Sequence, residues 1–170
     1  MKKLFLLYLF LPLSLLAQDT TFKKGIPADL DKEKIIFLAH EPIKVTARKK
    51  SGKAEKYLYE RQTNHNEVID ESNEKLKGAA MAYPFEYAIT TPSTYLYVAK
   101  AGYKYVLQSS VYTYDNLKGQ PVDNELIIYE YFIYDMRNNI AYEVFRIDEM
   151  KVYDFKLIIK KLNKAIKAAK

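Results

Sequence analysis

The chain has 170 residues, a hydrophobic fraction of 49%, a formal net charge of +6 and no cysteine. This length suffices for one domain with its own core. The lack of cysteine excludes disulfides, thiol chemistry and cysteine-ligated metals, and the modest positive charge is too weak to indicate a nucleic-acid partner.

The N-terminal residues are typical of a secretory signal peptide. Lys2 and Lys3 supply a positive start, and the apolar run over residues 4–16 is shorter than the roughly 20 residues that a membrane span needs. Ala17 is a small residue suited to cleavage, although Leu15 fits the small-residue rule poorly.

We therefore expect a cleaved signal peptide over residues 1–17 and a mature protein that begins at Gln18. Its net charge is +4, because the +6 of the whole chain includes two lysines of the signal segment. No cysteine follows the apolar run, so the protein is not expected to be a lipoprotein. Because the signal peptide is expected to be cleaved, we expect a periplasmic or secreted protein without a transmembrane span. The alternative is that residues 1–17 remain as an uncleaved N-terminal anchor.

The first half of the mature chain predicts two strands and two helices. Residues 18–33 are polar with Gly and Pro, which predicts a flexible leader. The apolar run at 34–40 predicts a buried strand. Helical periodicity over 54–82 predicts a long helix that the polar stretch 62–66 could interrupt. A strand at 84–90 and a short helix within 91–103 follow.

The second half predicts an antiparallel meander and a final helix. Strands are expected at 103–114, 125–135 and 140–147, with a turn-rich connection at 115–124 and a tight turn between the last two strands. Residues 148–170 predict an amphipathic helix, capped by Asp148. Its expected buried stripe is Leu157, Ile158, Leu162, Ala165, Ile166 and Ala169.

This order of elements predicts an α+β fold with an α/β-like first half. We expect a single mixed β-sheet of about five strands, with the long helix, the short helix and the C-terminal amphipathic helix packed on it. Residues 34–170 are expected to form one domain.

Tyrosines are abundant, with 16 in the chain, and several fall on the strand at 125–135. If Asn138 and Asn139 form a two-residue turn, the expected cross-strand pairs are Phe132 with Phe145, Ile133 with Val144, and Tyr131 with Arg146. The simpler interpretation places the tyrosines at the margin of a helix-covered sheet. The alternative is a partner-binding platform made by Tyr129, Tyr131 and Arg146.

Lysines cover the polar side of the C-terminal helix, and Lys160, Lys164 and Lys167 are candidate partner-binding residues. Such a basic face suits an acidic polymer, a lipid headgroup or an acidic protein. The alternative is an ordinary solvated helix face.

His40 and Glu41 follow the first apolar strand, where α/β proteins often place functional side chains. The second histidine, His65, lies 25 residues further on. Two histidines and a carboxylate are able to bind zinc, but the spacing matches no known zinc-protease helix. No catalytic, cofactor-binding or metal-binding residue is therefore predicted, and no cofactor is expected.

The chain resembles many small exported proteins of Bacteroidota that have no assigned function. The resemblance lies in the stretches LLAQ, YPFEY and GYKYVLQ and in the Lys/Tyr/Ile-rich composition. The element order over about 34–168 is also similar to small α/β domains of envelope assembly factors. Examples are the N-terminal domain of the Tol–Pal β-propeller protein and the curli-secretion lipoprotein. This second likeness is topological. It implies a fold and a compartment but no activity, and the chain lacks the curli protein's lipid-attachment Cys and a propeller.

We therefore expect an exported, non-enzymatic binding or scaffolding module of the cell envelope. Its expected partner is an envelope component such as an acidic polymer or protein, and nucleic acid is not expected. The alternative is a small hydrolase or metal-dependent enzyme that uses His40 and Glu41. The oligomeric state is left open.

Overall fold

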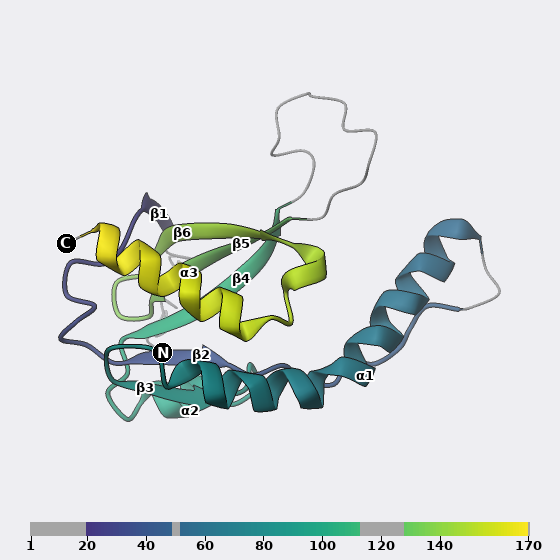
Figure 1. Ribbon diagram of the computed structural model, residues 1–170, viewed down its shortest axis with the longest axis horizontal. Helices are drawn as coiled ribbons and strands as arrows, with labels where there is room; N and C mark the ends of the chain where they lie inside the picture. The colour runs from purple at the N-terminus through teal and green to yellow at the C-terminus, as the bar shows by residue number, and fades with distance from the viewer. Residues whose placement is uncertain (1–19, 49–51, 113–127, 170) are drawn as a thin grey trace, which may run out of the picture.

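The computed structural model describes residues 20–48, 52–112 and 128–169 (Figure 1). A six-stranded mixed sheet has the order β1-β6-β5-β4-β2-β3, with the pairs β4–β5 and β5–β6 antiparallel and the rest parallel. The elements are β1 (Thr21–Lys24), β2 (Ile35–Leu38), α1 (Lys53–Ala80), β3 (Tyr87–Thr90), α2 (Tyr95–Ala99), β4 (Tyr105–Tyr112), β5 (Ile128–Asp135), β6 (Ile140–Asp148), the short 3₁₀ helix η2 (Glu149–Lys151) and α3 (Phe155–Ala168). The predicted α+β fold is confirmed, with one strand more than expected.

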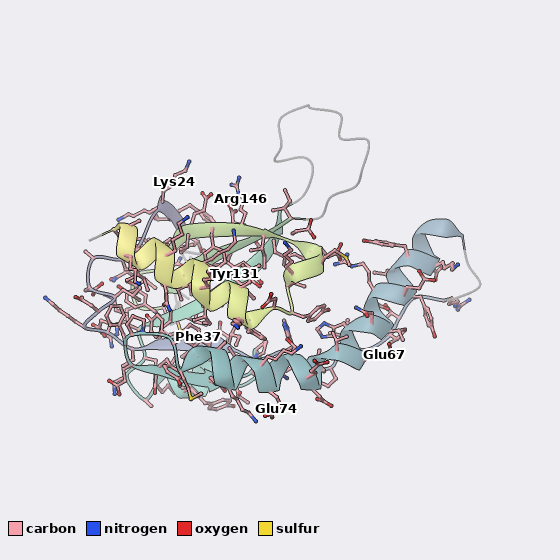
Figure 2. The ribbon with its side chains drawn as sticks, viewed as in Figure 1. Lys24, Phe37, Glu67, Glu74, Tyr131 and Arg146 are labelled. Carbon is pink, nitrogen blue, oxygen red and sulfur yellow. The ribbon has the colours of Figure 1, made fainter. Side chains whose placement is uncertain are left out.

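The second half of α1 and the whole of α3 cover one face of the sheet, and the core lies between these layers. Figure 2 shows Phe37 and Tyr131 on this inner side, whereas Glu67 and Glu74 lie on the outer side of α1. No helix in the described part of the chain has the length and apolar character that a membrane crossing requires. The buried residues of the core cluster include Ile35, Phe37, Leu76, Tyr105, Leu107, Tyr131, Ile133, Ile158 and Leu162.

The helix α1 runs unbroken through the polar stretch 62–66, where the sequence allows an interruption. Polar side chains on one face of α1 bind the backbone of the extended segment 40–48, which lies beside it. Asn66, for example, accepts from the Ile43 N–H at 2.9 Å and donates to the Ile43 carbonyl at 2.9 Å. The residues that bind in this way are Glu55, Gln62, His65, Asn66 and Asn73. The polar residues of α1 therefore hold the chain that leads into it.

The expected flexible leader at 18–33 has regular structure in its described part. Thr21–Lys24 form β1, which adds to β6 as a parallel edge strand, and Leu30 is buried in the core. All four residues of β1 are exposed, with Phe22 at 72%, so no alternation of buried and exposed residues marks this strand in the sequence. Backbone pairing with β6 thus gives part of the expected leader a regular structure that the side chains do not signal.

The predicted register between β5 and β6 is wrong. Asp135 pairs with Ile140 across a four-residue loop, and a bulge between Tyr131 and Phe132 shifts the register again. Tyr131 consequently pairs and stacks with Phe145, with ring centroids 5.0 Å apart and an interplanar angle of 15°. The other predicted pairs fail too: Phe132 faces Glu143, Ile133 faces Tyr142, and Arg146 faces Glu130.

The C-terminal helix begins later than the sequence predicts. Asp148 caps η2 by accepting from the Met150 N–H, and Asp154 caps α3 by accepting from the Leu157 N–H. Within the expected stripe, Leu157 and Ala165 are only half-buried and Ala169 is exposed. The buried residues of α3 are Phe155, Ile158, Ile159, Leu162 and Ile166. The predicted connection at 115–124 and the signal segment at 1–17 lie outside the described residues.

Candidate functional site

A groove of about 1150 Å³ runs between α1 and α3 and contains the three lysines singled out from the sequence. Packing sets this arrangement, because α3 turns its apolar face to the sheet and leaves Lys160, Lys164 and Lys167 on the opposite side, spaced at i, i+4 and i+7. The full lining is Lys75, Gly78, Ala79, Ala82, Met150, Tyr153, Asp154, Lys156, Ile159, Lys160, Asn163, Lys164 and Lys167.

Apart from Lys75, the α1 side of the groove consists of small residues. Gly78 and Ala79 lie in the last turns of α1, and Ala82 follows the helix end. A Cβ built on Gly78 would meet no atom within 4 Å, so the groove is open directly above this glycine. Asn163 of α3 crosses toward this wall and donates to the Ala82 carbonyl at 2.8 Å, which ties the two walls together.

The α3 side of the groove is strongly cationic. Lys156 joins the three predicted lysines, and all four are exposed and form no ion pair with another described residue. Lys75, on the α1 side, pairs with Glu71 at 2.6 Å. Asp154 is the one acidic residue among the described residues that line the groove. The described residues therefore leave the positive charge of this rim largely uncompensated.

The three other candidate residues do not join into one platform. Tyr131 is 5% exposed and lies in the core, where burial raises the pKa of its hydroxyl. Tyr129 is half-buried, and its hydroxyl accepts from Arg61 at 3.1 Å. Arg146 is exposed and pairs with Glu130 at 2.7 Å and Glu143 at 3.0 Å, pointing away from the helices (Figure 2). The two tyrosines and the arginine are thus divided between the two faces of the sheet.

His40 and His65 come together at the end of β2, although they are far apart in the sequence. Their ring centroids are 5.7 Å apart, and both line a cavity of about 520 Å³. Both nitrogens of His65 are engaged, Nδ1 with the Tyr153 hydroxyl at 2.9 Å and Nε2 with the Glu41 carbonyl at 2.8 Å. The Glu41 carboxylate accepts from the Ser93 hydroxyl. In the described ranges, no cluster of three or more His, Cys, Asp or Glu side chains is arranged to hold a metal ion.

The environment of His40 keeps its ring neutral. Burial, and then the neighbouring His65, lower the pKa of His40 to about 4. Its ring packs at centroid distances of 5.1 Å against both Tyr153 and Phe155, and its Nε2 is buried without a hydrogen-bond partner among the described residues. A neutral imidazole enclosed in this way is a poor general base near pH 7.

The candidate residues chosen from the sequence leave out most of the lining, including Lys75, Gly78, Lys156 and Asn163. Lys156 continues the spacing of the lysine row, and a glycine inside a long helix is itself unusual because it weakens the helix. The packing of α1 against α3 cannot be read from the sequence of either helix alone.

No protein-family model, curated protein or solved structure matches the chain.

Proposed function

We propose that the protein is an exported, non-enzymatic binding module of the cell envelope that holds an anionic envelope component in the groove between α1 and α3. The observation that carries the proposal is the row of four lysines on α3, which faces a groove and has no described ionic partner. Unpaired cations along a concave surface attract anions, because their fields add there. Export is supported by the signal-like residues 1–17.

Removing charge from this rim should weaken association with the envelope. We expect the triple change Lys160→Gln, Lys164→Gln and Lys167→Gln to lower co-sedimentation with cell envelopes several-fold at low salt, while the melting temperature stays close to that of the wild type. Raising the ionic strength from about 0.01 M to about 1 M should have the same effect on the wild type, because the screening length falls from about 30 Å to about 3 Å.

A matched control tests whether location matters as well as charge. Lys23, Lys24 and Lys32 are exposed, lie outside the groove and form no ion pair with a described residue, so their replacement by Gln changes the net charge equally. This control variant should sediment like the wild type. Equal retention of all three proteins at both salt concentrations would contradict the proposal.

The alternative function is a small hydrolase or metal-dependent enzyme that uses His40 and Glu41. The cavity shared by His40 and His65 favours it, since ligands or catalytic groups must lie close together. However, His65 has both nitrogens engaged, the Glu41 carboxylate is engaged by Ser93, and His40 is neutral and enclosed. We therefore favour the binding module.

A further inference from the structure

We propose that the ligand of the groove is an anionic amphiphile with a single acyl chain, such as a fatty acid or a lysophospholipid. This inference rests on the proposed function and narrows its ligand class. The acyl chain lies along the groove between α1 and α3, and the anionic group contacts the lysines of α3.

Part of the groove lining is apolar, and a polar polymer would gain nothing from contact with it. Gly78, Ala79 and Ala82 form the α1 side together with Lys75, and Ile159 of α3, which is only 2% exposed, adds little accessible surface. Met150, at 86% exposure, adds a flexible apolar side chain to the lining. An acidic polysaccharide would contact only the lysine rim, whereas an acyl chain also removes this apolar surface from water.

The dimensions of the groove suit an elongated ligand. Its volume of about 1150 Å³ is slightly above the usual range of ligand pockets, which is roughly 300–1,000 Å³. Lys156 and Lys167 are eleven residues apart on α3, a distance of roughly 16 Å along the helix axis. A single extended chain reaches along this row of lysines, whereas a compact small molecule covers only part of it.

The charges also favour one orientation of the ligand. Asp154 lies at the N-terminal end of α3, close to Lys156, and would repel an anion there. Lys160, Lys164 and Lys167 lie farther along the helix, where no carboxylate among the described residues lines the groove. The anionic group is therefore expected at the C-terminal end of α3, with the acyl chain extending toward Met150.

The first test measures the dependence of binding on chain length and head-group charge. Octanoate and dodecanoate are titrated into the protein as monomers, with dodecyltrimethylammonium as the cationic control. Each buried methylene contributes about fourfold in affinity, so dodecanoate should bind at least tenfold more tightly than octanoate. The cationic amphiphile should bind at least tenfold more weakly than dodecanoate.

The second test fills the groove without touching a lysine. The change Gly78→Leu places a side chain in the space above the helix, where a Cβ meets no atom within 4 Å, and leucine favours the helix more than glycine does. We expect this variant to keep or raise the melting temperature and to lose at least tenfold in dodecanoate affinity. Gly78→Ala, the matched control, adds a single methyl group and should retain most of the binding.

The outcomes separate this inference from the proposed function. If polyglutamate binds the wild type and Gly78→Leu equally, in a salt-sensitive way, while chain length has no effect, the amphiphile proposal is wrong and the anion-binding module stands. If neither dodecanoate nor polyglutamate binds, and the envelope does not retain the protein, both proposals are wrong. Chain-length dependence that Gly78→Leu abolishes and Gly78→Ala preserves supports both.

Discussion

Replacing Phe37 by alanine is expected to lower the free energy of unfolding by about 3–5 kcal/mol, the usual cost of removing a large ring from a packed core. Phe37 is 1% exposed on the interior strand β2 and belongs to the buried core cluster together with Leu76 of α1 and Leu162 of α3. Its ring contacts Tyr83 edge-on, with centroids 5.1 Å apart, and lies 5.6 Å from the ring of Tyr87. Removing the ring therefore removes apolar burial and aromatic contacts together. Urea unfolding monitored by circular dichroism measures it.

Phe132 is the matched control for Phe37. The two-residue turn expected from the sequence would bury Phe132 against Phe145, but the observed register leaves it half-buried and opposite Glu143. Phe132→Ala should therefore cost clearly less than Phe37→Ala, about 1–2 kcal/mol. Equal losses for the two variants would contradict the placement of Phe132 outside the core cluster.

Asp135→Ala is the second change with a large expected effect, about 3–5 kcal/mol of unfolding free energy, as for breaking a buried ion pair. Asp135 is 1% exposed and accepts from the backbone N–H groups of Arg137 at 2.9 Å and Asn138 at 3.0 Å. It also lies 3.6 Å from the Lys104 ammonium, which pairs with Asp29 at 2.5 Å. Alanine would leave the two backbone N–H groups without their acceptor at the turn that joins β5 to β6, and Lys104 would keep only Asp29.

Arg137→Ala changes the same turn but leaves the buried carboxylate of Asp135 in place. The Arg137 side chain is exposed and pairs with Glu33 at 3.1 Å. An exposed ion pair contributes about 0–1 kcal/mol, so this variant should unfold almost like the wild type. Thermal unfolding of both variants in the same buffer compares them directly. A larger loss for Arg137→Ala than for Asp135→Ala would show that the surface pair, and not the buried carboxylate, stabilises the turn.

Local patterns in the sequence predict the sheet and the helices well, whereas contacts between distant segments limit the detail. The two faces of β5 alternate as expected of a strand, with Tyr131 and Ile133 buried and Phe132 and Tyr134 half-buried. The register of β5 with β6 depends on Asp135, which accepts hydrogen bonds from the backbone N–H groups of the turn. It also depends on Asn139, which adopts a φ of 54°, a conformation that asparagine tolerates. The bulge after Tyr131 adds a second shift. A two-residue turn is only the simplest assumption, and the sequence alone does not distinguish it from the observed loop.

The same limit applies to the candidate site. Lysine spacing identifies Lys160, Lys164 and Lys167 as one exposed face of a helix, and the structure places all three along the groove. The opposite wall comes from residues near the end of α1, about 80 positions earlier in the chain. Its position depends on how both helices pack on the sheet. The polar stretch of α1 is a further example, because Gln62 and Asn66 bind the distant segment 40–48 in place of interrupting the helix.

Lysine labelling on intact envelopes tests most directly whether the groove is the binding surface. The full-length protein is acetylated with and without envelope membranes, and the modification of each lysine is measured by peptide mass spectrometry. We expect Lys160 and Lys164 to lose most of their labelling when membranes are present, together with Lys167, while Lys23 and Lys24 remain fully reactive. Unchanged labelling of the groove lysines in membrane-bound protein, or protection of the control lysines in their place, would contradict the proposed site.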